Sequence, residues 1–493
     1  MFALKNLIVR FLVRCLADRR PQTKVSSGTL HIVVPRWDAK LGDAIVSSFF
    51  FHEAQKLNAR VTVLTVAELA PIHAQDFGVN EVIVTDANPS IAQLFKIARQ
   101  LGKVDVVVHL VNRIRSVEIL FLRLLRPAKV YSFDDDLQCV NRKLGIETAS
   151  LNAPERFERV LLDLGAREVV RKYIVPLPPP SHIANHAPQI LINPFASRPD
   201  KSLAFDKALR LLCAVADAYP KKAIGILCSP RSLADAKNLE ATIARKNVLA
   251  LDDVNTPQKA AAYINDAQAI ISVDTATVHM AVGLETKLVA IYPDIGNEHN
   301  PWLPPASINT RVVYSHQDEF EQRRTGKKNM NMFNVEDVVS NLDILMGKNP
   351  ESTQTISLQA CIIPGLGAAT ETLSRQLPLI SQDFPEVSVC HWGTINLKLE
   401  CPLIVTNPDH RTVPLAWTPS KRTREVFDLL RIELELHISQ TRRRVPAWLY
   451  IAHSSPHRRT PMIHEVIATP LNLTDVESCR IHLRESAVSL AAV

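Results

Sequence analysis

Two series of short apolar runs, each alternating with amphipathic helical stretches, constrain the fold of this 493-residue chain more than any other feature. The first series comprises residues 31–35, 60–66, 81–86, 104–111 and 130–133, and the second comprises 189–196, 223–229, 247–251, 269–274 and 287–293. Runs rich in Val and Ile that alternate with helix-period segments are typical of βαβ units around a buried parallel sheet. The sequence therefore predicts an α/β protein with two Rossmann-like lobes, over residues 29–175 and 189–347.

A proline-rich segment, residues 176–188, separates the two series and predicts a semi-rigid linker. Four prolines within its first five positions exclude a helix interior or a central strand. Two doubly wound lobes joined in this way enclose a cleft, and such folds bind ligands beyond the carboxyl ends of their strands. We therefore expect the chemistry at the strand-to-helix junctions that face this cleft.

The remaining part of the chain has a different pattern. A polar linker, residues 348–357, precedes a region at 358–493 in which short β-like runs alternate with few helical signals. This pattern predicts a small β-barrel-like domain at the C-terminal end. Within it, residues 420–439 are expected to begin as a helix and to continue as a strand.

Charge and cysteine content narrow the class of protein. The chain has a net charge of +7, of which residues 1–25 supply +5, so a generally basic surface for nucleic acid is excluded. None of the eight cysteines forms a Cys-x-x-Cys pair, which argues against a zinc site. Cysteines in apolar runs predict core thiols in a reducing compartment, and we expect a cytoplasmic protein.

The first 28 residues predict a basic amphipathic helix. Apolar residues recur at helical spacing, but Arg10 and Arg14 interrupt the apolar stretch well before the ~20 residues that a membrane span needs. One interpretation is a helix on the anionic face of the inner membrane, with residues 1–25 in contact with lipid. The alternative is a terminal helix that packs on the first lobe with its arginines in water.

The first junction with chemistry is residues 35–48, PRWDAKLGDAIVSS, directly after the first apolar run. Gly42 permits a tight turn, and Asp43 lies where the next helix opens into the cleft. Aspartate is also a preferred N-terminal cap of helices, so spacing alone leaves capping as an alternative role for Asp43.

The second junction is residues 192–203, INPFASRPDKSL, at the start of the second lobe. Asn193, Ser197 and Arg198 offer polar contacts near the strand end, and Lys201 offers a cation for a phosphate. A solvated loop is the alternative.

The third junction is residues 272–293, SVDTATVHMAVGLETKLVAIYP. Asp274 ends a strand, Thr275 can cap the following helix, and His279 lies one turn further along the same helix face. Helix N-termini present free N–H groups and the positive end of the helix dipole, so this junction suits a diphosphate. A buried structural histidine is the alternative.

Taken together, KLGDAIVSS, INPFASRPDKSL and DTATVHMAVGLETKLVAIYP resemble the ADP-heptose:lipopolysaccharide heptosyltransferases, which form glycosyltransferase family 9. The resemblance covers about two thirds of the chain, roughly residues 29–347, and implies the two-lobed GT-B fold. It implies transfer of a heptose-like sugar, with inversion, from a nucleotide-sugar donor to a lipopolysaccharide-type or related anionic glycan. No cofactor is implied for this transfer.

The resemblance also implies roles for individual residues. Asp43 would be the general base on the acceptor hydroxyl. The second lobe would bind the donor diphosphate through Asn193, Ser197, Arg198, Lys201, Asp274, Thr275 and His279. Two positions depart from the family pattern, because Ala276 stands where the family has a glycine and Leu203 where a tryptophan is usual.

Three segments of the C-terminal domain resemble the archaeal CTP-dependent riboflavin kinases, which are small cradle-loop barrels. They are IIPGLGAATETLSRQLP with Gly365 and Gly367, HWGTINLKLE with Thr394 and Asn396, and the late EVIATPLNL. The resemblance implies a nucleotide loop at the two glycines. It also implies that Thr394 and Asn396 bind Mg²⁺ together with CTP.

Two alternatives to a sugar transferase follow from these patterns. In one, the C-terminal domain is a CTP-dependent kinase of a small alcohol, and the two lobes serve as a binding scaffold. In the other, the chain has no catalytic activity and assembles a surface-glycan complex through its nucleotide sites.

Overall fold

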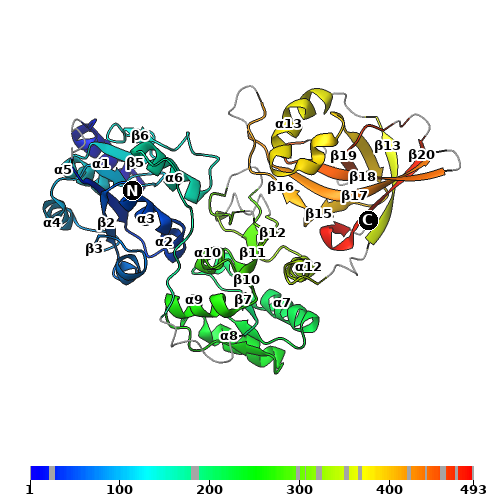
Figure 1. Ribbon diagram of the computed structural model, residues 1–493, viewed down its shortest axis with the longest axis horizontal. Coiled ribbons are helices and arrows are strands. Elements are labelled where there is room, and N and C mark those ends of the chain that lie inside the picture. Colours follow the sequence, from blue (N-terminus) through cyan, green and yellow to red (C-terminus); the bar gives the residue numbers. More distant parts are fainter. Residues whose placement is uncertain are drawn as a thin grey trace.

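The computed structural model shows two parallel sheets followed by an antiparallel barrel, as the sequence predicts (Figure 1). It describes residues 2–21, 28–178, 188–295, 300–305, 307–317, 325–348, 355–364, 369–418, 424–438, 441–455, 462–471, 473 and 476–490. The predicted α/β class with two Rossmann-like lobes and a C-terminal β-barrel is confirmed.

The first lobe is a six-stranded parallel sheet in the order β3-β2-β1-β4-β5-β6. Its strands are β1 (Leu30–Arg36), β2 (Ala59–Thr65), β3 (Glu81–Val84), β4 (Val106–Val108), β5 (Lys129–Ser132) and β6 (Arg142–Lys143). Its helices are α2 (Leu41–Val46), α3 (Ser48–Lys56), α4 (Ile91–Leu101), α5 (Ser116–Leu125) and α6 (Ala153–Leu164). The five predicted runs form β1 to β5, and the two-residue β6 is an addition at the edge.

The second lobe repeats this architecture in the order β12-β11-β10-β7-β8-β9. Its strands are β7 (Ile190–Asn193), β8 (Ile224–Ile226), β9 (Val248–Ala250), β10 (Ala269–Val273), β11 (Lys287–Pro293) and β12 (Thr310–Ser315). Its helices are α7 (Phe205–Ala218), α8 (Leu233–Ile243), α9 (Pro257–Asp266), α10 (Ala276–Gly283) and α12 (Val335–Leu345). Every residue of the central strand β10 is buried, as expected for a sheet covered on both faces.

Six antiparallel strands close into the barrel in the order β17-β18-β19-β14-β13-β20, and β20 pairs back onto β17. They are β13 (Thr355–Ile363), β14 (Ile395–Leu399), β17 (Phe427–Ile438), β18 (Thr441–Ala452), β19 (Ile463–Ala468) and β20 (Val476–Arg484). Outside the barrel lie α13 (Ala369–Asp383), β15 (Leu403–Val405), β16 (His410–Arg411) and β21 (Val488–Leu490). The start of residues 420–439 was expected to be helical, and its described part from Arg424 is not.

Strand β17 replaces that expected helix because its apolar residues alternate. Leu430, Ile432, Leu434 and Leu436 all belong to the buried barrel core. A period of two places them on one face of a strand, whereas a helix would scatter them around its axis. Pairing with both β18 and β20 then fixes the strand.

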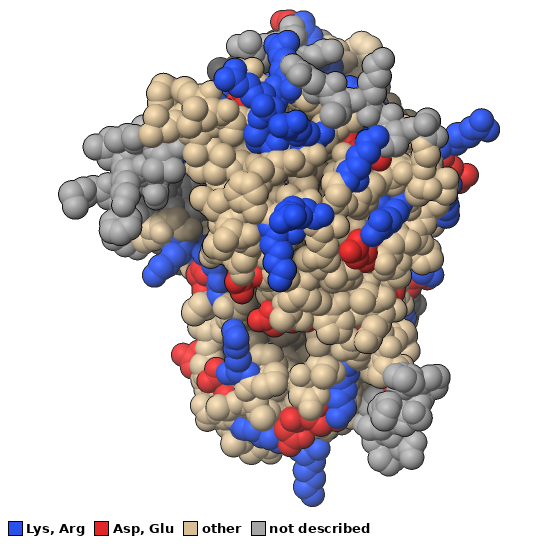
Figure 2. Space-filling model, turned by 90° about the vertical axis from the view of Figure 1, so that its left-hand side faces the viewer, with Lys and Arg blue, Asp and Glu red and all other residues tan. Residues whose placement is uncertain are grey.

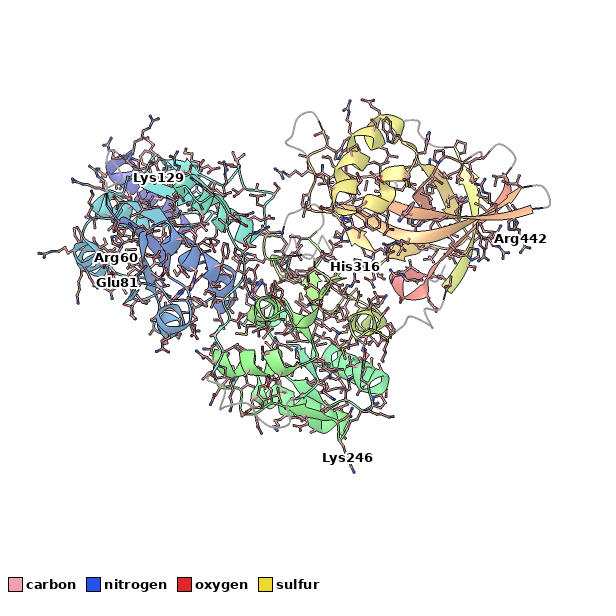
Figure 3. The ribbon with its side chains drawn as sticks, in the orientation of Figure 1. Arg60, Glu81, Lys129, Lys246, His316 and Arg442 are labelled. Atoms are coloured by element: carbon pink, nitrogen blue, oxygen red, sulfur yellow. The ribbon has the colours of Figure 1, made fainter. Side chains whose placement is uncertain are left out.

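A buried arginine links the barrel to the second lobe. In Arg411, Nε and Nη2 donate to Asp428 at 2.6 and 2.7 Å, and Nη1 lies 3.1 Å from Oδ1 of Asp294 after β11. The same guanidinium lies 4.0 Å from the ring centroid of Tyr314 in β12. His316 lies at this boundary, whereas Arg442 lies at the far end of the barrel (Figure 3). The barrel therefore docks on the β11–β12 side of the second lobe.

Replacing Arg411 with Ala is expected to lower the stability of the barrel by about 3–5 kcal/mol, because two buried carboxylates lose their common partner. Burial alone would raise the pKa of Asp428, but Arg411 and His453 hold it well below its usual range. Urea unfolding followed by tryptophan fluorescence measures the loss. Arg375→Ala is the control, since its exposed ion pair with Glu371 contributes only about 0.2–1 kcal/mol. Equal unfolding midpoints for the two variants would contradict this role.

Helix α1 (Phe2–Ala17) packs against α5 of the first lobe. Nη2 of Arg10 lies 3.1 Å from Oδ2 of Asp134, and Nη2 of Arg14 donates to the carbonyl of Asp136 at 2.9 Å. The helix therefore packs on the first lobe, as one of the two alternatives predicts. Arg10 is largely buried against protein, so the expectation that the arginines lie in water is wrong for Arg10, whereas Arg14 is 40% exposed and Arg19 and Arg20 are exposed. No helix in the described part of the chain is long and apolar enough to cross a bilayer.

Candidate active site

The N-terminal part of α2 in the first lobe contacts the N-terminal part of α10 in the second lobe, at the interface between the lobes. Gly42 makes this approach possible. A Cβ atom at Gly42 would lie 3.0 Å from Cδ2 of His279 and 3.4 Å from Cα of Ala276. Because Gly42 has no side chain, the two junctions that the sequence singled out come into direct contact.

Replacing Gly42 with Val is expected to hold the lobes apart, because the added carbon atoms overlap His279 and the α10 backbone. Overpacking of this kind costs about 1–3 kcal/mol, equivalent to about 5- to 150-fold weaker closure. A larger radius of gyration in solution scattering and weaker nucleotide binding are the expected results. Gly28→Val is the control, because Gly28 has no atom within 4 Å of an added Cβ. An unchanged radius for Gly42→Val would contradict the contact.

Asp43 is the third residue of α2 and is not its N-cap, which is Lys40. The capping alternative for Asp43 is therefore wrong. Its side chain is 24% exposed, and the Lys40 ammonium lies 3.9 Å from Oδ2. Burial raises the pKa of Asp43, although Arg36 and Lys40 act in the opposite direction. A carboxylate of raised pKa at the cleft is suited to accept a proton.

Arg36, at the end of β1, lies behind Asp43 and was not predicted. Its Nη2 donates to the backbone carbonyl of Asp43 at 3.2 Å and to Oγ of Ser47. The Ser47 hydroxyl in turn donates to the same carbonyl at 2.9 Å. These bonds fix the turn that carries Asp43. Burial lowers the pKa of Arg36, and the Asp43 carboxylate acts against this shift.

Lys201 and Asp274 form an ion pair in the second lobe, with 2.7 Å between Nζ and Oδ2. Lys201 ends a short 3-10 helix (Pro199–Lys201), and Asp274 directly follows β10. Asp43 and His279 both lie close enough to Lys201 for its charge to act on their titration. Residues from all three predicted junctions therefore converge on one site.

Asn193 and Thr275 form hydrogen bonds that hold the turn between β10 and α10. Nδ2 of Asn193 donates to the hydroxyls of Ser272, Thr275 and Thr277 at 3.3, 3.2 and 2.8 Å. Thr275 is the N-cap of α10, and its Oγ1 accepts from the Thr277 N–H at 3.3 Å. The amide and hydroxyls thus hold the turn between β10 and α10, so Asn193 shapes the site through its neighbours.

His279 belongs to α10 of the second lobe, lies beside Gly42 of the first lobe, and is 5% exposed. Its ring contacts Tyr173 and Trp302 edge-on, with centroid distances of 6.5 and 6.4 Å. Burial lowers its pKa to about 4, so the imidazole is neutral at pH 7. Nδ1 is buried and has no hydrogen-bond partner among the described residues. A neutral imidazole can donate a hydrogen bond to a phosphate oxygen but adds no charge.

The other two predicted donor contacts, Ser197 and Arg198, lie in the loop that precedes Lys201. Ser197 is exposed, and Arg198 forms a bidentate pair with Asp200 at 2.9 and 2.7 Å. Lys328, which the sequence did not single out, donates its backbone N–H to Asp200 at 3.3 Å. Burial lowers the pKa of Lys328, and the neighbouring Lys201 adds to the effect. Lys328 is thus a second cation near the site.

In the barrel, Thr394 and Asn396 lie beside Glu465. Asn396 is directly opposite Glu465 in the β14–β19 register, and Oγ1 of Thr394 donates to Oε1 of Glu465 at 3.4 Å. Asn396 is 6% exposed, and its Oδ1 has no partner in the described part of the chain. Gly365 and Gly367 lie outside the described residues. No group of three or more His, Cys, Asp or Glu in the described ranges could hold a metal ion.

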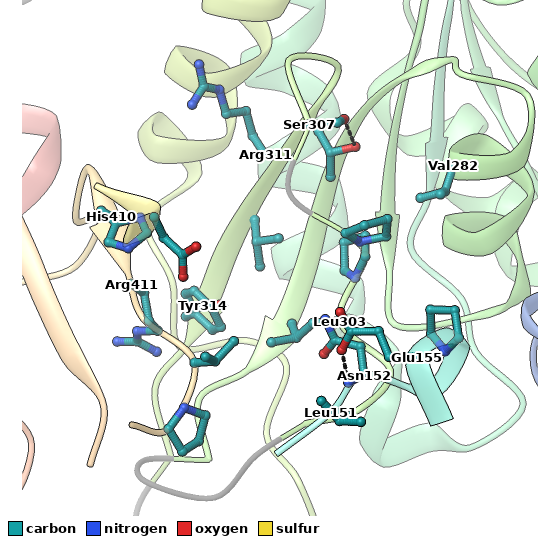
Figure 4. Close-up of a pocket in the computed structure, with 18 of the residues that line it drawn as sticks. Leu151, Asn152, Glu155, Val282, Leu303, Ser307, Arg311, Tyr314, His410 and Arg411 are labelled. Atoms are coloured by element: carbon teal, nitrogen blue, oxygen red, sulfur yellow. Dashed lines mark hydrogen bonds between the residues drawn. The ribbon is translucent and has the colours of Figure 1, made fainter. Parts of the chain in front are cut away.

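A separate cavity of about 1620 Å³ lies where the two lobes and the barrel meet (Figure 4). Glu155 of the first lobe, Leu303 and Tyr314 of the second lobe and Arg411 of the barrel all line it. Asp43, Lys201, Asp274 and His279 do not line this cavity. Most of the charged side chains that line the cavity form ion pairs with one another.

Comparison with known proteins finds a similarity to glycosyltransferases in the two lobes. Residues 94–332 match the family model of glycosyltransferase family 9 (heptosyltransferase). The family 9 glycosyltransferase of Veillonella parvula is 16% identical, with a TM-score of 0.53 over 66% of this chain and 100% of that one. The Escherichia coli heptosyltransferase WaaC with ADP is 15% identical, with a TM-score of 0.48 over 64% of this chain and 99% of that one. No curated protein matches the sequence.

Residues 94–332, just under half of the chain, are thus similar to glycosyltransferase family 9. The likeness to the Veillonella parvula structure shows the fold of the two lobes. The family match ends before the barrel, so the resemblance of the barrel to riboflavin kinases stays a prediction.

Proposed function

We propose that the two lobes form an inverting glycosyltransferase. It would move a heptose-like sugar from a nucleoside-diphosphate donor to a hydroxyl of a lipopolysaccharide-type or related glycan. One observation carries the proposal: Asp43 of the first lobe meets the Lys201–Asp274 pair and His279 of the second lobe across the cleft. The match of residues 94–332 to glycosyltransferase family 9 supports it independently.

In this proposal Asp43 accepts the proton of the acceptor hydroxyl. The hydroxyl oxygen attacks the anomeric carbon from the face opposite the diphosphate, the bond to the diphosphate breaks, and the configuration inverts. Arg36 and Ser47 hold the turn that carries Asp43, and burial raises its pKa. A positioned base of this kind contributes about 10²–10⁴-fold to the rate.

The departing diphosphate would bind at the N-terminus of α10. Free N–H groups and the helix dipole act there, and Lys201 and Lys328 add positive charge. His279 adds a hydrogen bond from a neutral ring. Lys201 would exchange its bond to Asp274 for one to phosphate. Ala276, the first residue of α10, places a methyl group where the family has a glycine, and we expect it to influence the choice of donor.

Thermal stability in the presence of nucleotides tests the proposal. The unfolding temperature is measured with a large excess of each of five ligands: ADP, UDP, GDP, CDP and ADP-heptose. At least one of them, present at about 1,000-fold its Kd, should raise the unfolding temperature. At that excess a ligand stabilises the folded state by about 4 kcal/mol. Lys221→Met, which changes an exposed lysine of the same lobe, is the control and should behave as the unmodified protein. If no nucleotide shifts the transition, the proposed donor site is wrong.

A second candidate function belongs to the barrel. Thr394, Asn396 and Glu465 bring oxygen atoms together on its outer side, and the Asn396 Oδ1 is buried without a partner among the described residues. Oxygen ligands suit Mg²⁺, so the residues fit the predicted ion. We propose that Thr394 and Asn396 would hold Mg²⁺, which would neutralise charge on the phosphates of a bound CTP.

Calorimetric titration with Mg²⁺ and CTP tests the barrel site. Asn396→Ala should abolish the binding heat that Mg²⁺ and CTP give together, because it removes the buried oxygen. Lys398→Ala is the matched control, since Lys398 lies on the same strand and is exposed. Equal heats for both variants would show that CTP binds elsewhere or not at all.

A further inference from the structure

Helix α1 uses one face to bind the first lobe. Val13 and Ala17 pack on its apolar core, and Arg10 and Arg14 bind Asp134 and the carbonyl of Asp136. Arg10 and Arg14 are thus bonded to the first lobe. This arrangement leaves the opposite face of the helix to solvent.

That opposite face is apolar. Phe11, Leu12 and Leu16 are 66%, 53% and 75% exposed, and Cys15 between them is also exposed. Leu12, Cys15 and Leu16 follow Phe11 by one, four and five residues, so the four side chains form one continuous stripe on the helix. We call these four residues the α1 ridge. Large apolar side chains gathered in this way on a surface helix mark an interaction site.

Positive charge borders the α1 ridge. Arg19 and Arg20 directly follow the helix and are exposed. Helix α4 repeats the combination, because Ile91 and Phe95 are 50% and 51% exposed and lie next to exposed Lys96 and Arg99. Helices α1, α5 and α4 lie along the outer edge of the first lobe (Figure 1). Lys and Arg side chains gather on the upper part of that side (Figure 2).

We propose that this face of the first lobe docks on the surface of an anionic membrane, with the α1 ridge in the boundary between headgroups and acyl chains. Apolar side chains with flanking arginines are the combination that a helix lying in an anionic interface requires. An acidic soluble protein would pair with the charges of Arg19 and Arg20. It would not bury the apolar side chains of Phe11, Leu12 and Leu16, whereas the acyl region of a membrane would. The proposal does not depend on the chemistry of the cleft, although it would place that cleft near a lipid-linked acceptor.

Co-sedimentation with vesicles tests the proposal. The full chain is mixed at low salt with phosphatidylcholine vesicles or with vesicles containing phosphatidylglycerol. Binding to the anionic vesicles is expected, and it should weaken at least tenfold when the ridge is changed by F11S, L12S and L16S together. The matched control changes three exposed apolar residues elsewhere, I146S, I308S and V389S, and should bind as the unmodified chain does.

A charge-reversal variant separates the two contributions. R19E combined with R20E should lower binding to phosphatidylglycerol vesicles and reduce its dependence on salt, since screening acts on these charges. Nucleotide-induced thermal stabilisation, measured on each variant, shows whether it is folded with an intact cleft. A failure of the proposed transferase activity would leave the vesicle result unchanged, so the two outcomes are distinguishable.

Three results would overturn the membrane proposal. The first is no binding of the unmodified chain to anionic vesicles at low salt. The second is equal binding by the ridge variant and its matched control. The third is a dimer of the unmodified chain in light scattering that the ridge variant converts to a monomer, because the ridge would then be covered by a second copy of the chain.

Discussion

Replacing Asp43 with Asn is expected to lower the rate of sugar transfer by about 10²–10⁴-fold while donor binding is retained. Asparagine keeps the size of the side chain but cannot accept the proton of the acceptor hydroxyl. The backbone bonds that fix the turn, from Arg36 and Ser47 to the Asp43 carbonyl, do not involve the carboxylate and should persist. Initial rates under saturating donor measure the loss, and calorimetry with the nucleoside diphosphate measures the binding that remains.

The pH dependence of the unmodified enzyme provides a second measurement of Asp43. The base must be ionised to act, so kcat/KM should fall as the pH drops through the pKa of Asp43. Burial raises that pKa, which places the acidic limb above the range of an ordinary aspartate, about 3.9. Asp38→Asn is the control, because Asp38 is half exposed in the same segment. A rate for Asp43→Asn near that of Asp38→Asn would exclude Asp43 as the base.

Replacing Lys201 with Met is expected to lower kcat/KM by about 10²–10³-fold, the usual effect of removing one charge-stabilising group from a transition state. Methionine keeps the apolar stem of the side chain and removes the ammonium. The variant also leaves the Asp274 carboxylate, 9% exposed, without its partner at 2.7 Å and facing the diphosphate. Donor affinity should therefore fall together with the rate.

A double variant separates these two effects of Lys201. Adding Asp274→Asn to Lys201→Met removes the unpaired negative charge, so part of the lost affinity for nucleoside diphosphate should return. Lys221→Met is again the control, since this lysine is exposed in the same lobe. Unchanged nucleotide affinity in Lys201→Met would show that the diphosphate binds away from this lysine.

Much of the fold could be predicted because its buried strands are continuous apolar runs. The exceptions have clear physical causes. Strand β12 lies at the edge of its sheet and alternates between exposed and buried residues, so no apolar run marks it. Helix α13 contains Pro378 and many polar residues, and packing against the barrel stabilises it. Strand β17 carries helix-forming residues, but pairing on both edges decides its conformation.

The candidate site was partly predictable for a similar reason. Asp43, Lys201, Asp274 and His279 lie at junctions between strands and helices, where the topology of a doubly wound fold brings residues together. Arg36 and Lys328 have no such signal, because their roles depend on bonds to residues that are close only in the folded chain. Arg198 forms a pair with Asp200, two residues later, and its predicted role at the donor stays a prediction.

The buried contacts of Arg411 have a consequence for motion. They tie the barrel to Asp294 and Tyr314 of the second lobe, so the two should rotate together when the cleft opens. The chain would then behave mechanically as two bodies, although it has two lobes and a barrel. The cavity of about 1620 Å³ is bordered by α6 of the first lobe on one side and by the barrel on the other, so its width would follow the opening angle. A molecule that fills this cavity would change the separation of the two lobes at the proposed sugar-transfer site without touching that site.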